Sequence, residues 1–93
     1  MSTEMSPRIA LVITLYPEKV PNFPELQKEE MVLVDKWKSE GLLENMYLLP
    51  ITKNGAVLIF KNVDESQIRK MTAELPFYPY MDKVEFLFLG KVF

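Results

Sequence analysis

Cysteine and histidine are both absent from this 93-residue chain. The absence of cysteine excludes a disulfide framework and a thiolate nucleophile. The absence of histidine excludes imidazole acid–base chemistry and most transition-metal sites. Any catalytic chemistry must therefore come from carboxylates, lysines, tyrosines or the backbone.

The chain also has little net charge and no long apolar run. Its formal charge is -2, and acidic and basic residues are mixed along the sequence. A strongly basic surface is the usual mark of a protein that binds nucleic acid or anionic membrane, so we expect neither partner. No apolar run approaches the roughly 18 residues that span a bilayer. Residues 1–7 lack an apolar core, so we expect a flexible tail rather than a signal peptide, and a cytoplasmic protein.

An apolar content of 48% is ample for one folded domain, which we place at residues 8–93. Segments rich in β-branched and aromatic residues predict four strands. These strands cover residues 8–16, 44–49, 56–61 and 83–89. Asn54-Gly55, between the second and third strands, is the strongest local signal for a hairpin turn.

Two further segments predict helices. The first covers residues 24–40, with Gly41 as the expected left-handed residue just beyond its end. The second begins after Asp64, which we expect to cap it with Gln67 as the capping-box partner. Pro76 ends this second helix because proline cannot continue a helical hydrogen-bond pattern.

The resulting order, β-α-β-β-α-β, is typical of an α+β ferredoxin-like sandwich. This fold has a four-stranded antiparallel sheet with two helices on one face. Two helices cover only that face, yet most of the predicted strands are apolar on both sides. An antiparallel sheet with a hydrated face should alternate apolar and polar residues. We therefore predict a homodimer that packs sheet to sheet.

Glu30 is the carboxylate with the most unusual position. It falls within the apolar stripe of the first predicted helix, beside Leu26, Leu33 and Trp37. A carboxylate on a core-facing stripe must be paired, hydrogen-bonded, or protonated through a raised pKa. A pKa near neutrality suits a general base that removes a proton from carbon. The alternative is that Glu30 reaches solvent or pairs with a lysine such as Lys53.

The tyrosines are candidates for ligand binding. Each combines an apolar ring with a hydroxyl that needs a partner when buried, which suits a small ligand with both polar and apolar parts. Packing in the core or at an interface is the alternative for each of them. The four are Tyr16, Tyr47, Tyr78 and Tyr80.

Residues 75–82, Leu-Pro-Phe-Tyr-Pro-Tyr-Met-Asp, resemble a motif of the muconolactone isomerases. In that family the second helix also ends in Leu-Pro, and an aromatic-Pro-Tyr-Met-Asp run leads into the last strand. A looser similarity extends from about Pro24 to the C-terminus. The resemblance implies a ferredoxin-like fold, swapped dimers that assemble further, and no cofactor. It also implies that a double bond shifts in a five-membered unsaturated lactone by proton abstraction and return, with Glu30 at the position of the family's acid–base glutamate.

The chain departs from this family in its second strand and hairpin. Asn45, Tyr47 and Leu48 stand where the isomerases carry histidine, tryptophan and arginine, and a longer turn at residues 52–55 replaces a Gly-His pair. The fold and assembly of the family are therefore expected to transfer better than its substrate.

The leading prediction is an isomerase-like protein in which Glu30 is catalytic and a cavity binds a small-molecule substrate. The predicted substrate-binding residues are Tyr16, Trp37, Asn45, Tyr47, Phe77, Tyr78 and Tyr80. One alternative is a non-catalytic ligand-binding or assembly module of the same dimeric α+β barrel superfamily. A weaker alternative is a cofactor-independent monooxygenase on that barrel. An enzyme should keep a cavity that Glu30 reaches, whereas an assembly module should fill that space with side chains.

Overall fold

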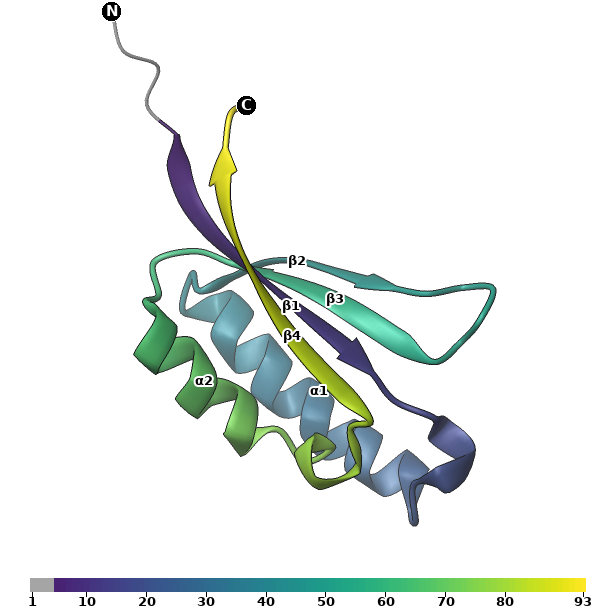
Figure 1. Ribbon diagram of the computed structural model, residues 1–93. Helices are drawn as coiled ribbons and strands as arrows, with labels where there is room; N and C mark the ends of the chain where they lie inside the picture. Colours follow the sequence, from purple (N-terminus) through teal and green to yellow (C-terminus); the bar gives the residue numbers. More distant parts are fainter. Residues whose placement is uncertain (1–4) are drawn as a thin grey trace, which may run out of the picture.

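The computed structural model describes residues 5–93, which fold in the order β-α-β-β-α-β (Figure 1). The strands are β1 (Ser6–Thr14), β2 (Leu43–Leu48), β3 (Gly55–Phe60) and β4 (Lys83–Lys91). The helices are α1 (Phe23–Ser39) and α2 (Glu65–Glu74), with short 3-10 helices η1 (Pro17–Lys19) and η2 (Tyr78–Tyr80). Within the described residues, no helix is both long and apolar enough to cross a membrane.

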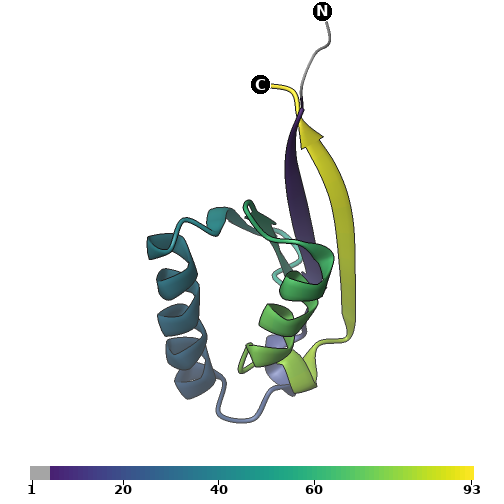
Figure 2. The same cartoon turned by 90° about the vertical axis from the view of Figure 1, so that its left-hand side faces the viewer.

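The strands form one antiparallel sheet in the order β2-β3-β1-β4. Leu11 of β1 lies at its centre, paired with Leu58 of β3 on one side and Phe86 of β4 on the other. Helices α1 and α2 lie side by side against the same face of the sheet (Figures 1 and 2). The predicted ferredoxin-like fold is therefore confirmed.

The outer ends of β1 and β4 reach further than the sequence predicted. Ser6 and Pro7 pair with Lys91 and Gly90, so β1 starts within the predicted tail and β4 continues past its predicted end. Figure 2 shows this two-stranded extension projecting beyond the helices. The first part of the predicted tail, residues 1–4, lies outside the described residues.

The helix ends follow the sequence signals. Gly41 has a φ of 76°, and the Leu42 N–H donates a hydrogen bond of 2.9 Å to the Trp37 carbonyl, which closes α1 in a Schellman motif. The Asp64 side chain accepts a hydrogen bond of 2.7 Å from the Gln67 backbone N–H at the start of α2. The predicted Gly41 and Asp64 caps are confirmed, but among the described residues the Gln67 side chain makes no return hydrogen bond to the Asp64 N–H, so the capping box is only half formed.

The β2–β3 hairpin is confirmed, but Asn54 and Gly55 do not form its turn. The residue with positive φ is Lys53, at 56°, and its N–H donates to the Leu49 carbonyl at 3.0 Å. Gly55 is instead the first residue of β3. A Cβ at this position would lie 2.5 Å from the carbonyl oxygen of Ile13, so Gly55 serves the close approach of β3 to β1.

The core lies between the helices and one face of the sheet. Trp37 of α1 packs edge-on against Phe60 of β3, with 5.7 Å between the ring centres. The other buried side chains of this cluster come from β1, α1, β2, β3 and α2 and from Leu75 just after α2, while β4 adds only partly buried residues. The buried side chains include Ile9, Leu11, Ile13, Val34, Leu58, Ile68 and Met71.

The opposite face of the sheet is also apolar and is uncovered in the single chain. We call it the outer face; its residues are Ala10, Val12, Tyr47, Val57, Ile59, Leu87 and Leu89. Tyr47 is 57% exposed, Leu87 49% and Leu89 42%. The apolar second face expected from the sequence is therefore present.

Alanine substitutions at two glycines test two different backbone constraints. At Gly41 a Cβ meets nothing within 4 Å, so Gly41→Ala should cost only the left-handed backbone penalty, about 1 kcal/mol of unfolding free energy. Gly55→Ala forces a Cβ against the Ile13 backbone, and we expect a larger loss of about 2–3 kcal/mol. Urea unfolding followed by circular dichroism measures both, with Gly41→Asn as the milder control. Equal losses at the two positions would contradict the close approach of β3 to β1.

Candidate functional site

A cavity of about 410 Å³ lies between α1, the β2–β3 hairpin and the segment that follows α2. Its wall is mainly apolar, with Ile13, Val34, Met46, Leu58 and Phe77 among the lining residues. Leu48, on the hairpin side, also lines the cavity and is 67% exposed, so the cavity opens to solvent there. Its polar lining side chains are Gln27, Glu30 and Lys53.

The space exists because the sheet carries small residues at this point. Ala56 of β3 pairs with Ile13 of β1 and Leu48 of β2, and Gly55 precedes it. A larger residue at position 56 would project toward α1 and occupy the cavity, because Ala56 shares the helix-facing side of β3 with Leu58. The small side chain of Ala56 therefore helps to leave the cavity open.

Glu30 projects from α1 into this cavity. Its Oε1 accepts a hydrogen bond of 3.2 Å from the backbone N–H of Phe77, which follows α2. Burial among apolar groups raises the pKa of Glu30 from 4.5 to about 7, and the Phe77 hydrogen bond offsets a smaller part of this rise. Lys53 lines the same cavity, but within the described residues no ion pair joins it to Glu30. Glu30 thus combines an apolar setting, one hydrogen bond and a pKa near neutrality.

Of the predicted substrate-binding residues, Phe77 lines the cavity. Its ring stacks on Phe23 at the start of α1, with 5.1 Å between the ring centres. Trp37 lies deeper in the core, 3% exposed, because it sits nearly two turns beyond Glu30 and packs on Phe60. Trp37 is not among the lining residues of the cavity.

Three of the predicted tyrosines also lie outside the cavity lining: Tyr16, which precedes α1, and Tyr78 and Tyr80, which follow α2. Tyr16 is half-buried, and the Lys19 ammonium lies over its ring at 4.9 Å. Tyr78 and Tyr80 are 44% and 42% exposed in η2, because the 3-10 turn directs Phe77 rather than its neighbours inward. The tyrosine hydroxyls expected to contact a substrate are therefore not grouped around Glu30.

Asn45 and Tyr47 point to the outer face because β2 contains a β-bulge. The register shifts between Leu43, which pairs with Phe60 of the core, and Asn45, which pairs with Ile59 of the outer face. In a regular strand these odd-numbered residues would share the side of Leu43. The bulge reverses the alternation, so Met46 and Leu48 face the cavity instead.

Most of the lining residues were not predicted from the sequence as site residues, among them Gln27, Met46, Leu48 and Lys53. Gln27 could have been predicted, because it lies three residues before Glu30 and therefore on the same side of α1. Met46 and Leu48 depend on the bulge, for which the sequence carries no clear signal. Lys53 was considered only as a partner for Glu30.

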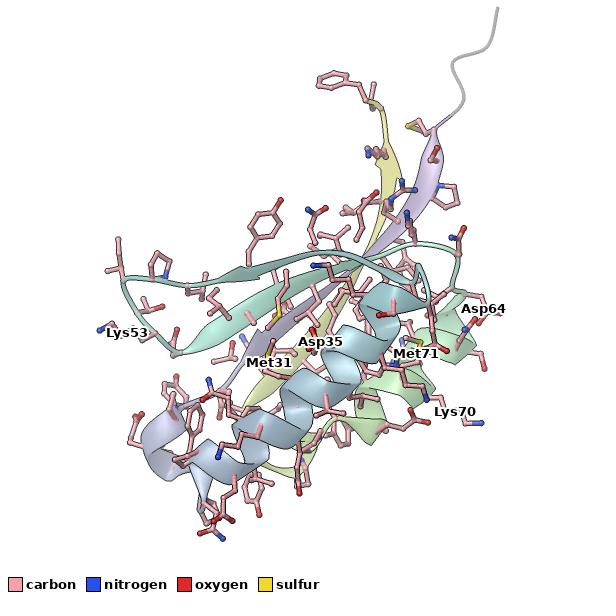
Figure 3. The ribbon with its side chains drawn as sticks, turned by 180° about the vertical axis from the view of Figure 1, so that it is seen from behind. Met31, Asp35, Lys53, Asp64, Lys70 and Met71 are labelled. Atoms are coloured by element: carbon pink, nitrogen blue, oxygen red, sulfur yellow. The ribbon has the colours of Figure 1, made fainter. Side chains whose placement is uncertain are left out.

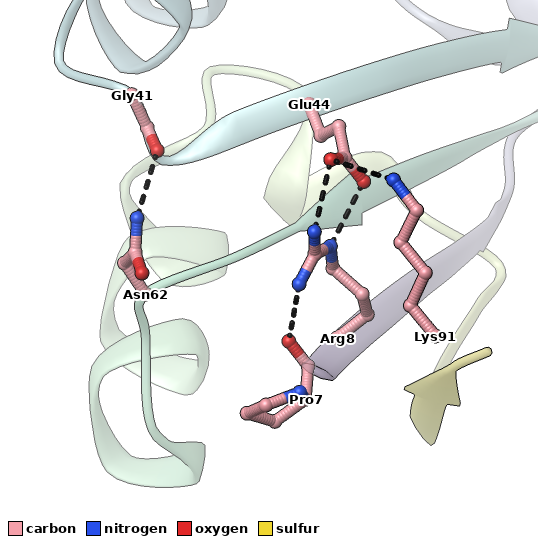
Figure 4. A network of polar contacts seen from close by, with 6 residues as sticks. All are labelled: Pro7, Arg8, Gly41, Glu44, Asn62 and Lys91. Atoms are coloured by element: carbon pink, nitrogen blue, oxygen red, sulfur yellow. Dashed lines mark hydrogen bonds and ion pairs between the residues drawn. The ribbon is translucent and has the colours of Figure 1, made fainter. Parts of the chain in front are cut away.

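A second polar cluster lies away from the cavity (Figure 4). Arg8 of β1 binds Glu44 with two hydrogen bonds, from Nε to Oε1 at 2.9 Å and from an η nitrogen to Oε2 at 3.1 Å. The Lys91 ammonium lies 3.5 Å from Oε2 of the same carboxylate. The Arg8 hydrogen bonds are the main reason that the pKa of Glu44 falls to about 2. This cluster joins the bulge of β2 to β1 and β4 across the sheet.

A comparison with models of known protein families found no match to this chain, and a search of curated protein sequences found none either. Within residues 5–93, no three acidic side chains gather closely enough to hold a metal ion. The cavity and the Glu30 carboxyl are therefore the features of this chain that indicate a function.

Stability should depend on pH through Glu30. Its pKa is about 7 in the folded protein and 4.5 in the unfolded chain, so the folded state binds more protons between these values. The contribution of Glu30 to the unfolding free energy is thus complete below about pH 4.5 and is lost as the pH rises through 7. Because the carboxyl remains partly hydrated, we expect a decrease of about 1–2 kcal/mol between about pH 5 and 8.

Urea unfolding at several pH values measures this decrease, and Glu30→Gln should abolish it. Glu29→Gln, which removes an exposed carboxylate from the same helix, is the matched control and should leave the decrease in place. Glu44 titrates near pH 2, far below this range. A decrease that persists in Glu30→Gln would show that another group causes it.

Proposed function

We propose that this protein is a muconolactone isomerase-like enzyme that shifts a double bond beside a carbonyl group, with Glu30 as the acid–base residue. The observation that carries the proposal is the Glu30 carboxyl in the wall of an otherwise apolar cavity, with a pKa of about 7. A general base works best when its pKa is close to the pH of the reaction. Burial in a low-dielectric site is a common way to bring a carboxyl to that value.

The proposed reaction needs no second proton carrier. Near pH 7 about half of the Glu30 side chains are ionised. Oε1 accepts the Phe77 hydrogen bond, so Oε2 is the oxygen available to take a proton from the carbon attached at the far end of the conjugated C=C–C=O system. The electron pair of the broken C–H bond forms a dienolate. Glu30 then returns the proton to the carbon next to the carbonyl, which completes the shift without any net gain or loss of atoms.

Gln27 supplies a polar group for the intermediate. It lies one helical turn before Glu30 and lines the same cavity. Its amide N–H₂ can donate a hydrogen bond to the dienolate oxygen as negative charge develops there. This role takes the place of the tyrosine hydroxyls that the sequence suggested.

The size and walls of the cavity support a small substrate. A volume of about 410 Å³ is in the range of small-ligand pockets, and apolar walls strengthen electrostatic interactions by excluding water. A five-membered unsaturated lactone, the substrate type of the family that residues 75–82 resemble, fits within this volume. An assembly module would have no need to leave this space unfilled.

Glu30→Gln should reduce turnover of muconolactone by at least about 100-fold, because it removes the group that carries the proton. Proton NMR in deuterated water follows both the product and the exchange of the transferred hydrogen. Turnover by the unaltered protein should rise with pH through about 7, as Glu30 ionises. Glu29→Gln is the matched control. Unchanged turnover in Glu30→Gln would overturn the mechanism, and ligand binding without turnover by the unaltered protein would favour a binding module.

We also propose that the outer face is the contact surface of a homodimer. On β4 the residues of this side alternate as Glu85, Leu87, Leu89 and Lys91, an acidic end, an apolar middle and a basic end. A two-fold axis between the two leucines brings Glu85 of one copy near Lys91 of the other. This row of four β4 side chains is thus complementary to a second copy of itself, as an isologous interface requires. Assembly beyond the dimer would use other surfaces.

Charge exchange tests this dimer. Glu85→Lys alone should weaken the dimer about tenfold, because like charges then face each other across the axis. Combining Glu85→Lys with Lys91→Glu should restore part of the loss, because Lys91→Glu re-forms the opposite charges across the axis but also gives up the ion pair with Glu44. Analytical ultracentrifugation over a range of concentrations measures the dissociation constant, and circular dichroism checks folding. A chain that remains monomeric at high concentration would overturn the proposal.

A further inference from the structure

We propose that Lys53 is a specificity-determining residue of the cavity, and that it selects small apolar ligands bearing one negative charge, such as a carboxylate. The inference rests on the proposed function in that the selected ligand would be the one on which Glu30 acts. It extends that function by naming the residue that recognises the charged group of the ligand.

Lys53 is the cationic residue of the cavity lining. The other polar lining residues are Gln27 and Glu30, and the rest of the wall is apolar. An anionic ligand that met only this wall and the Glu30 carboxylate would lose hydration and gain repulsion. Lys53 offers the one compensating charge. Within the described residues its ammonium makes no ion pair, so it is available to a ligand.

The backbone fixes where Lys53 stands. Its φ of 56° is in the left-handed region, which asparagine and glycine adopt more readily than lysine. The chain has Asn54 and Gly55 immediately afterwards, yet neither takes this conformation. Hydrogen bonds hold the arrangement, from the Lys53 N–H to the Leu49 carbonyl at 3.0 Å and from the Leu15 N–H to the Asn54 carbonyl at 2.8 Å. Strained residues of this kind concentrate at ligand sites.

The position of Lys53 at the opening of the cavity determines how an anionic ligand would be oriented. Figure 3 shows Lys53 at the end of the β2–β3 hairpin, on the side where exposed Leu48 marks the opening of the cavity. An apolar body would lie against Met46 and Leu58, and the anionic group would remain at the opening beside Lys53. This orientation keeps the ligand's charge hydrated and separate from the Glu30 carboxylate. A neutral ligand of the same shape would keep the apolar contacts but lose the charge interaction.

Two probes of matched shape test the inference: phenylacetate, which is anionic, and phenylacetamide, which is neutral. Isothermal titration calorimetry at low ionic strength gives both dissociation constants. We expect phenylacetate to bind about five- to tenfold more tightly, and added salt to reduce this preference. Lys53→Met should remove the preference while leaving the affinity for the amide unchanged, and Lys53→Arg should retain it. Lys70→Met, on α2 away from the hairpin (Figure 3), is the control and should behave as the unaltered protein.

The same titrations in Glu30→Gln separate this inference from the proposed reaction. The preference for phenylacetate should persist there, because it depends on Lys53 and not on proton transfer. Persistence of the preference in a protein without isomerase turnover would leave the inference standing and overturn only the proposed reaction. Equal affinity for the two probes, binding of neither at millimolar concentration, or a preference that survives Lys53→Met would each overturn the role of Lys53.

Discussion

The hydrogen bond from the Phe77 N–H to Glu30 joins two parts of the chain that lie 47 residues apart. A carboxyl on the inward side of a helix is costly to bury without a partner, and a backbone N–H that follows a helix end is equally in need of an acceptor. Each satisfies the other here. The stack of Phe77 on Phe23 holds the same two segments together from the apolar side. The cavity is bounded by the elements that this pair of contacts connects.

Two glutamates of this chain show how the surroundings decide what a carboxyl can do. Glu44 receives two hydrogen bonds from Arg8 and lies near Lys91, and its pKa falls to about 2. Such a carboxylate remains charged at every physiological pH and serves to hold strands together. Glu30 has one hydrogen bond from a neutral donor and apolar surroundings, and its pKa rises to about 7. Only a carboxyl of the second kind changes its protonation readily near neutral pH.

The sequence predicted the helices and their ends well where they depend on interactions between residues close in the chain. Gly41 and Asp64 mark helix ends through their own backbone or side-chain hydrogen bonds, so the sequence alone identifies them. Helical periodicity likewise predicted that Glu30 faces inward, because 3.6 residues per turn leave little freedom in which side a residue takes. The fold class followed from the order of these elements.

The details that depend on tertiary contacts were harder to predict. The bulge beside Glu44 reverses the alternation of β2, and its ion pairs come from β1 and β4, which are distant in sequence. Asn45 and Tyr47, which the sequence predicted as substrate-binding residues, therefore face the outer face and not the cavity. Asn54-Gly55 does not form the predicted turn for a related reason. A glycine is required at position 55 because the Ile13 carbonyl approaches the β3 backbone there, and not because of the hairpin turn.

The bulge also links the two faces of the sheet. Beyond it, β2 presents Met46 and Leu48 to the cavity and Tyr47 to the outer face. β2 is an edge strand, paired with β3 on one side and with no strand of the described sheet on the other. A second copy packed on the outer face would press on Tyr47 and restrain the strand whose other side forms the cavity wall. Dimerisation would then order the cavity without contributing a residue to it. In such an arrangement, the apolar outer face and the site around Glu30 would serve one purpose.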